Sequence, residues 1–198
     1  MKIKICGLFQ NEDINYVNEA LPDYIGFVFA KSKRQVSYNQ ARALRQNLNA
    51  KIKVVGVFVN AKIAEIEFLV NQKIIDLIQL HGDESDEYIK QLKSKVKVPI
   101  IKAIKVADQN SLTDLNYSVD YYLLDNVISG SGKVFNWSYI KQLDKPYFLA
   151  GGINLDNLDA ALKINAYCLD VSSGVETNGV KDGLKIKEMV RRVKENGR

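Results

Sequence analysis

Short apolar runs recur along the chain at intervals that predict a repeated strand–helix unit. Each run is rich in β-branched or aromatic residues and is bounded by polar residues or glycine. Most of the runs lack the polar–apolar alternation of a half-exposed strand, which is typical of a parallel sheet buried on both faces. The sequence predicts eight such strands, at residues 2–6, 24–29, 53–59, 75–80, 98–103, 120–125, 147–150 and 167–171.

Eight helical stretches are predicted between and after these strands. The clearest are residues 61–72, 154–163 and 182–196, where apolar side chains recur three and four positions apart and so share one helix face. Asp83 and Asn154 stand where helix N-caps are expected, because their short side chains can accept from free backbone N–H groups.

Strict alternation of strand and helix predicts a parallel sheet with right-handed crossovers. An open doubly wound sheet also alternates, but eight units without Gly-x-Gly-x-x-Gly after the first strand favour closure. The expected fold is therefore α/β, a single (β/α)8 TIM barrel domain over residues 1–198. Its helices and loops must be short, because such barrels usually need about 250 residues.

Composition narrows the classes of function. The chain is 46% hydrophobic and 26% charged, as is usual for a soluble globular protein. Its net charge is +5, but lysine and arginine are spread along the predicted helices rather than clustered with aromatic residues. We therefore expect no nucleic-acid partner, whereas an anionic metabolite is compatible with the charge.

Cellular context and cofactors follow from what the sequence lacks. Cys6 and Cys168 are too few for a disulfide framework. The N-terminus shows no signal-peptide pattern, and no apolar run approaches the roughly 18 residues of a membrane span. We expect a reduced, cytoplasmic protein without a membrane partner. No metal-site spacing, nicotinamide fingerprint or Walker loop is present, so neither metal nor cofactor is expected. Nothing in the sequence specifies an oligomeric state.

Two glycine-rich turns predict a phosphate site. The turn after the seventh strand contains Gly151 and Gly152, and the turn after the eighth contains Ser172 and Gly174. Glycines can serve merely to turn the chain, but barrels commonly bind phosphate with these two loops, where backbone N–H groups can approach an anion. A third turn, residues 129–133, could fold over a ligand or be a plain solvent loop.

Cys6 and Asp125 are the candidate acid–base pair. They end the first and sixth predicted strands, and the carboxyl ends of barrel strands carry the active site. A thiolate there could act as base or nucleophile if positive charge lowers its pKa. A carboxyl group after so apolar a run needs a partner or a raised pKa. Each residue alone could be structural, but together they favour catalysis. Cys168, inside a strand, is expected to be a small buried hydrophobe.

Two further polar residues follow strands. Arg34, in the loop after the second strand, could hold a carboxylate through two parallel hydrogen bonds or could be an ordinary surface arginine. His81, the only histidine, follows the fourth strand and could contact a substrate or hydrogen-bond its own loop.

Eight segments match those of one enzyme family, in order and at the family spacing. They are KICGL (4–8), YIGFVFAKSKRQVS (24–37), VVGVFVN (54–60), IQLHGDES (78–85), LLD (123–125), GSGKVFNW (130–137), AGGINLDN (150–157) and LDVSSGVE (169–176). With them the chain resembles the phosphoribosylanthranilate isomerases of tryptophan biosynthesis, and KICG, QLHG, GSGK and DVSSGVE are highly specific as a set.

The resemblance implies an Amadori rearrangement of N-(5-phosphoribosyl)anthranilate to 1-(2-carboxyphenylamino)-1-deoxyribulose 5-phosphate, a small-molecule reaction without a cofactor. It implies that Cys6 is the general base for the C2 proton and Asp125 the general acid for the ring oxygen. It also implies that Arg34 receives the anthranilate carboxylate and that Asp170 faces the ribose hydroxyls. The phosphate is assigned to the two turns that contain Gly151, Gly152, Ser172 and Gly174.

The chain departs from the family pattern at Phe9, where a threonine is usual; a phenylalanine cannot supply a hydroxyl. It could stack on the anthranilate or pack beneath the loop. The alternative functions are a non-catalytic phospholigand-binding barrel and another phosphosugar isomerase or lyase of the same fold. The latter would use Lys/Glu pairs or a metal at the strand ends, and Lys102 has no evident partner in the sequence.

Overall fold

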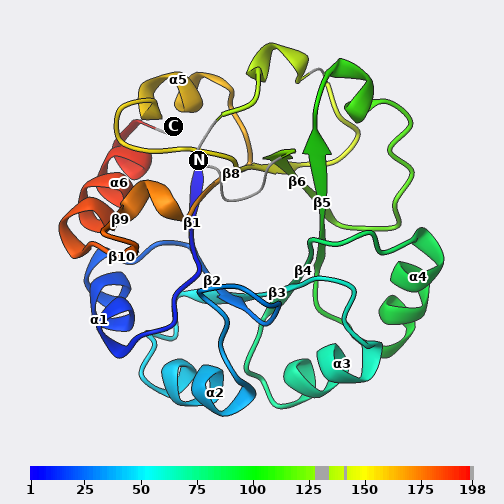
Figure 1. Ribbon diagram of the computed structural model, residues 1–198, viewed down its shortest axis with the longest axis horizontal. Helices are drawn as coiled ribbons and strands as arrows, with labels where there is room; N and C mark the ends of the chain where they lie inside the picture. Colours follow the sequence, from blue (N-terminus) through cyan, green and yellow to red (C-terminus); the bar gives the residue numbers. More distant parts are fainter. Residues whose placement is uncertain (128–133, 141, 197–198) are drawn as a thin grey trace.

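Eight parallel strands close into a barrel in chain order, with β8 paired to β1 (Figure 1). The computed structural model describes residues 1–127, 134–140 and 142–196. The strands are β1 (Lys2–Cys6), β2 (Tyr24–Val28), β3 (Lys53–Phe58), β4 (Leu77–Leu80), β5 (Ile100–Val106), β6 (Tyr121–Asn126), β7 (Tyr147–Leu149) and β8 (Cys168–Val171). The predicted fold class is confirmed, and each observed strand overlaps its predicted range.

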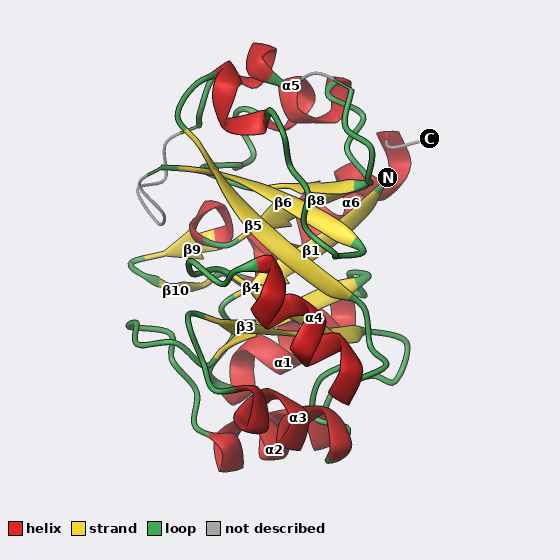
Figure 2. Cartoon of the chain, turned by 90° about the vertical axis from the view of Figure 1, so that its right-hand side faces the viewer, coloured by secondary structure: helices red, strands yellow, loops and turns green. Residues whose placement is uncertain are grey.

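α-Helices surround the barrel on most of its circumference. They are α1 (Asn11–Ala20), α2 (Tyr38–Gln46), α3 (Ile63–Asn71), α4 (Asp86–Lys95), α5 (Leu158–Lys163) and α6 (Gly183–Asn196). Figure 2 shows the strands crossing the molecule obliquely with α1 to α4 packed outside them. Among the helices of the described segments, none is long and apolar enough to cross a membrane.

The expectation of eight helical stretches is wrong for two connections. In the part of the chain that the structure describes, only the 3-10 turns η1 (Gln109–Leu112) and η2 (Trp137–Tyr139) follow β5 and β6. Around η1 the sequence is polar, and the Asp108 carboxylate accepts from the backbone N–H groups of Asn110 and Ser111. Such local bonds compete with the hydrogen bonds of a continuous helix, so the helical part of this connection is a single 3-10 turn.

Both predicted N-caps are also wrong. α4 is capped by Ser85, whose hydroxyl accepts from the Tyr88 N–H at 3.3 Å, so it begins beyond Asp83. Asn154 accepts instead from the backbone of Asp156 and Asn157, closing a turn before α5 begins. Asn side chains form such turns as readily as they cap helices, which is why the sequence misplaces the start of α5.

The barrel interior is layered because alternate strand residues face inward. At one end lies an apolar layer centred on Phe148, whose ring lies 5.6 Å from those of Tyr24, Tyr121 and Tyr167. Cys168, fully buried, belongs to this layer, as expected. The next inward-facing layer toward the mouth contains the buried polar residues Lys4, Gln79 and Asp170. Two residues further along the same strands, Cys6, His81 and Ser172 lie at the mouth itself.

A hairpin that the sequence analysis did not predict follows β8. Its strands, β9 (Glu176–Thr177) and β10 (Val180–Lys181), pair antiparallel through an Asn-Gly turn and lie beside α6 and α1 (Figure 1). Asn178 and Gly179 both have positive φ, 53° and 82°, as a tight hairpin turn of this kind requires. The hairpin brings two charged side chains, Glu176 and Lys181, back toward the mouth.

The apolar layer predicts where the stability of the barrel lies. Phe148→Ala should lower the free energy of unfolding by about 3–5 kcal/mol, because it replaces a fully buried ring by a cavity. Phe68→Ala, which removes a ring that is 48% exposed and contacts Tyr38, should cost no more than about 1.5 kcal/mol. Urea denaturation of both variants measures the difference, and equal costs would contradict this layering.

Candidate active site

The Cys6 thiol occupies space left by a glycine on the next strand. Cys6 is the last residue of β1 and lies opposite Gly26 of β2. A Cβ at Gly26 would stand 2.6 Å from the Cys6 Sγ atom, so no larger residue fits there without displacing the thiol. Both predicted acid–base residues lie at the same end of the barrel, because Cys6 is the last residue of β1 and Asp125 the last but one of β6.

Two buried ammonium groups act on the Cys6 thiol. Burial, and to a smaller extent the Asp170 carboxylate, raise the pKa of Cys6, and the positive charges of Lys4 and Lys181 oppose that rise. Lys4 is fully buried, and its Nζ atom donates to Asp170 Oδ2 and to Gln79 Oε1, each at 2.9 Å. Burial disfavours its charge, but Asp170 and Cys6 more than compensate and raise the pKa of Lys4. The cation beside Cys6 is therefore fixed in place.

Asp125 has the partner that its position demands. Its Oδ2 atom lies 3.3 Å from His81 Nε2, and its Oδ1 atom accepts from the Asn126 N–H at 2.8 Å. The other ring nitrogen of His81, Nδ1, lies 2.8 Å from Gln79 Nε2. The His81 side chain thus bonds two other site residues rather than its own loop. Its contact with substrate stays a prediction.

These contacts join the two candidate catalytic residues in one connected series. From Asp170 the series runs through Lys4, Gln79 and His81 to Asp125. Cys6 joins it through the Lys4 ammonium. Side chains from strands 1, 4, 6 and 8 are thereby held in fixed relation across the mouth.

One carboxylate oxygen of Asp170 accepts no hydrogen bond from the described residues. Its Oδ1 atom is buried and has no hydrogen-bond partner among the described residues, whereas Oδ2 accepts from Lys4. A buried acceptor without a donor is costly, so such an atom in a site is suited to a hydroxyl that arrives with a ligand. This agrees with the expectation that Asp170 faces sugar hydroxyls.

The two glycine-rich turns for which phosphate binding is predicted pack directly against each other. A Cβ at Gly174 would lie 1.9 Å from the Ile153 carbonyl oxygen, so the close approach requires glycine. Gly152 and Gly174 line one cleft with Ser173 and Lys185. Gly151 and Gly152 have φ values of 83° and 70°, which free their backbone from the ordinary helical path. Ser172 donates its hydroxyl to the Cys6 carbonyl oxygen at 3.1 Å and so ties the second turn to β1.

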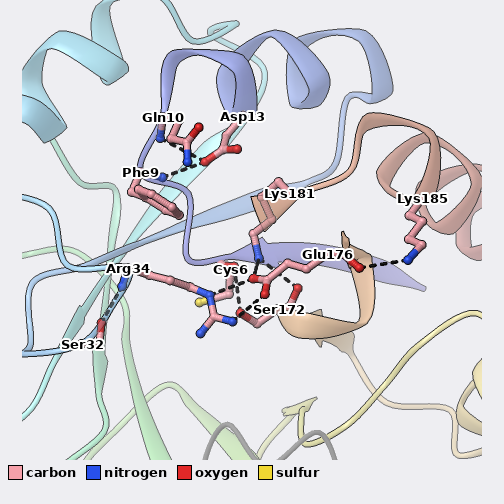
Figure 3. A network of polar contacts seen from close by, with 10 residues as sticks. All are labelled: Cys6, Phe9, Gln10, Asp13, Ser32, Arg34, Ser172, Glu176, Lys181 and Lys185. Carbon is pink, nitrogen blue, oxygen red and sulfur yellow. Dashed lines mark hydrogen bonds and ion pairs between the residues drawn. The ribbon is translucent and has the colours of Figure 1, made fainter. Parts of the chain in front are cut away.

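Arg34 is held by a carboxylate rather than lying free on the surface. Its Nε and Nη2 atoms each donate to Glu176 at 2.7 Å, and its side chain is only 16% exposed (Figure 3). No described residue hydrogen-bonds Nη1. Arginine has donors on two edges, so one edge is fixed by Glu176 and the other can bind a carboxylate.

Glu176 also anchors the second ammonium group. Lys181, with a fully buried side chain, donates to Glu176 Oε1 at 2.8 Å and to the Ser172 carbonyl at 2.9 Å. Burial lowers the pKa of Lys181, although Glu176 opposes this. Figure 3 shows Lys181, Glu176 and Arg34 grouped beside Cys6. One hairpin thus positions a cation near the thiol and an arginine at the mouth.

The sequence analysis missed four residues of the site. Lys4 and Gln79 precede Cys6 and His81 by two positions, so the period of a strand places each pair on one inward face. That signal was available in the sequence. Glu176 and Lys181 depend on the hairpin folding back over the mouth, for which the Asn-Gly pair was the only local sign.

Lys102 corrects a further expectation, because it does have a partner. Its Nζ atom donates to Glu84 Oε2 at 2.9 Å and to the Gly82 carbonyl at 2.6 Å. Lys102 alternates with Ile101 and Ala103, which belong to the interior layer, so its side chain points away from the barrel axis. The pair braces the loop after β4 and is not a Lys/Glu pair inside the barrel.

Phe9, in the loop between β1 and α1, is partly buried, and stacking of its ring on the anthranilate stays a prediction. The Phe9 side chain contacts the hydrophobic core outside the barrel, its backbone N–H donates to Asp13, and its carbonyl accepts from Gln40.

The turn 129–133 lies outside the described residues, so its predicted role stays a prediction. In the described segments, no group of three or more side chains could hold a metal ion.

A closed (β/α)8 barrel with a thiol, a carboxyl and two abutting glycine turns at one mouth has the layout of the barrel enzymes, whose active sites lie at the carboxyl ends of the strands. Comparison identifies the family within that class. The family model of N-(5'-phosphoribosyl)anthranilate (PRA) isomerase matches residues 3–192, and the chain belongs to this family.

Individual relatives agree over nearly the whole chain. An N-(5'-phosphoribosyl)anthranilate isomerase of Endomicrobium trichonymphae is 50% identical over 195 residues, covering 96% of each chain. The crystal structure of the Thermus thermophilus phosphoribosyl anthranilate isomerase is 30% identical, with a TM-score of 0.87 over 98% of this chain and 99% of that one. Another solved isomerase, bound to reduced 1-(o-carboxyphenylamino)-1-deoxyribulose 5-phosphate, is 30% identical with a TM-score of 0.81 over 98% and 99%.

The electrostatics around Cys6 predict a pH shift in its reactivity. Lys181→Met removes a cation that lowers the pKa of the thiol, so the midpoint of Cys6 alkylation by iodoacetamide should move to higher pH, because only the thiolate reacts. Cys168 should stay unmodified in the native protein, because it is fully buried and its pKa is raised.

The control is Lys187→Met, which removes an exposed lysine from α6 and should leave the midpoint unchanged. A midpoint that stays in place or falls in Lys181→Met would show that this ammonium does not act on the thiol.

Proposed function

We propose that this protein catalyses the Amadori rearrangement of N-(5-phosphoribosyl)anthranilate in tryptophan biosynthesis, with Cys6 as general base and Asp125 as general acid. The observation that carries the proposal is the series of contacts from Lys4, whose charge acts on Cys6, through Gln79 and His81 to Asp125. The isomerase with a bound deoxyribulose phosphate derivative supports a phosphoribosyl compound as ligand. We place the reaction in the cytoplasm and in a single domain of 198 residues.

The first step opens the ribose ring. Asp125 gives its proton to the ring oxygen as the C1–O bond breaks, and the nitrogen lone pair forms a C=N bond to C1. The carboxylate left behind faces His81 Nε2 and accepts from the Asn126 N–H. Donors already in place stabilise the negative charge as it develops, without reorganisation during the reaction.

The second step moves the C2 proton. The Cys6 thiolate takes this proton, the C–H electrons form a C1=C2 bond, and the nitrogen regains its lone pair to give the enol-amine. The enol then loses its hydroxyl proton while C1 gains one, giving the ketose. The Lys4 and Lys181 ammonium groups favour the thiolate that this step requires.

Three sets of residues would hold the substrate around these groups. The exposed edge of the Arg34 guanidinium would bind the anthranilate carboxylate, and Asp170 Oδ1 would accept from a ribose hydroxyl. The turns containing Gly151, Gly152, Ser172 and Gly174 would bind the phosphate through backbone N–H groups. Fixing both ends of the substrate aligns C2 with Cys6 and the ring oxygen with Asp125.

The acid–base assignment predicts two inactive variants. Cys6→Ala and Asp125→Asn should each lower kcat by about 10²–10⁴, the usual scale of general acid or base catalysis. The loss of anthranilate-type fluorescence from freshly made substrate measures turnover. Cys168→Ala, which removes the other thiol, is the control for cysteine loss and should retain activity if it folds. Turnover within a few-fold of wild type in either catalytic variant would refute its role.

The same assay separates catalysis from the alternative of ligand binding alone. A non-catalytic barrel would change the fluorescence only in proportion to the protein added, whereas an enzyme continues until the substrate is consumed.

The carboxylate site predicts a binding defect. Arg34→Met should raise KM about tenfold or more, the scale of a lost charged hydrogen bond, while Glu176 keeps Lys181 as partner. Arg42→Met, which removes an exposed arginine of α2, should leave KM unchanged. Steady-state kinetics on the anthranilate substrate measures both, and an unaltered kcat/KM in Arg34→Met would rule out the proposed carboxylate contact.

A further inference from the structure

The orientation of the Gln79 amide follows from the ion beside it. Lys4 Nζ lies 2.9 Å from Gln79 Oε1. Both residues are buried, since Lys4 is 0% and Gln79 1% exposed to solvent. An ammonium group only donates hydrogen bonds, so the amide must present its oxygen to Lys4. The amide NH₂ group is therefore turned the other way, toward the barrel mouth.

The amide in turn determines the tautomer of His81. Gln79 Nε2 lies 2.8 Å from His81 Nδ1, and an NH₂ group can only donate in this contact. Nδ1 must accept and carries no proton, so the proton of the neutral ring is on Nε2. A proton on Nδ1 would require the amide to flip, and its NH₂ group would then face the Lys4 ammonium.

The tautomer of His81 determines whether an N–H group or a nitrogen lone pair faces the Asp125 carboxyl group. His81 Nε2 lies 3.3 Å from Asp125 Oδ2, so the N–H on that nitrogen is directed at the carboxyl group. In the opposite tautomer a nitrogen lone pair would face the carboxylate and repel it. A third group that fixes a histidine tautomer in this way is known to matter greatly for proton transfer at the next residue.

We propose that Lys4 and Gln79 are positioning residues of the isomerase site, which fix His81 in the Nε2–H tautomer so that it stabilises the carboxylate formed on Asp125. This proposal rests on the proposed function for its kinetic consequence. The tautomer itself depends only on the fold. The Lys4 ammonium then serves both halves of the site: its charge favours the Cys6 thiolate, and its hydrogen bond sets the donor at Asp125.

The single histidine makes the tautomer directly measurable. Protein labelled with [15N]histidine contains one imidazole, so its two ring-nitrogen signals belong to His81. In the wild type we expect a protonated, pyrrole-type signal from Nε2 and an unprotonated, pyridine-type signal from Nδ1. The reverse pattern, or an averaged pair of signals, would overturn the proposal without any substitution.

Gln79→Glu reverses the local bonding. One oxygen of the new carboxylate accepts from Lys4, and the other oxygen faces His81 Nδ1 and can also only accept. Nδ1 must therefore carry a proton, and its signal becomes pyrrole-type. We expect kcat to fall on the order of tenfold or more. The loss should be smaller than the ~10⁴-fold loss in enzymes where the histidine with the wrong tautomer is itself the group that transfers the proton. KM should change little, because Arg34 and the two glycine turns, which would hold the two ends of the substrate, are untouched. A changed tautomer with wild-type kcat would show that His81 does not assist Asp125.

Two further variants secure this result. Gln79→Met keeps the length of the side chain but cannot donate to Nδ1, so His81 should lose its single fixed tautomer and kcat should fall with KM again little changed. Gln91→Glu introduces the same charge at an exposed position of α4 and should alter neither the spectrum nor the kinetics. Failure of the proposed function would instead leave the wild-type tautomer intact while Cys6→Ala and Asp125→Asn remained active.

Discussion

A lysine ammonium buried inside the barrel is the constraint on which the site depends. An isolated charge in a protein interior is costly, and it persists only when partners and hydrogen bonds compensate for the lost water. Lys4 is compensated by the Asp170 carboxylate and the Gln79 amide oxygen, and it lies beside the Cys6 thiol. Satisfying this one cation fixes side chains from β1, β4 and β8 at once.

The consequence is a site whose polar groups are arranged before substrate arrives. Asp170 is left with one oxygen for a ligand, and Gln79 with one donor for His81. The β9–β10 hairpin adds a second fixed centre, in which Glu176 holds both Arg34 and Lys181. Fixed charges of this kind lower a reaction barrier most effectively when they need no rearrangement, and here a lysine from each of the two centres acts on Cys6.

The parts of the molecule that sequence predicts well are those specified by local periodicity. Eight apolar runs predicted eight strands, and the ends of those strands brought Cys6, His81 and Asp125 to one mouth. Local pattern also misled. Asp83 and Asn154 precede the residues that cap α4 and α5, and in the described chain the polar segments after β5 and β6 form only 3-10 turns.

What sequence did not predict depends on contacts between distant segments. Arg34 and Glu176 are 142 positions apart, and only the folded hairpin brings them together. Lys102 was expected to lack a partner because its partner, Glu84, lies beyond the preceding strand and on the outer side of the barrel. The two-residue spacing of Lys4 from Cys6 did carry information, since alternate residues of a strand share a face.

The central claim is that Cys6 removes the proton from C2 of the substrate, and following that proton tests it most directly. Substrate deuterated at C2 should lose its label to water as wild-type protein turns it over. With Cys6→Ala, the account predicts that recovered substrate keeps the label, since the remaining site supplies no base at this position. Release of deuterium by Cys6→Ala at the wild-type rate would contradict it.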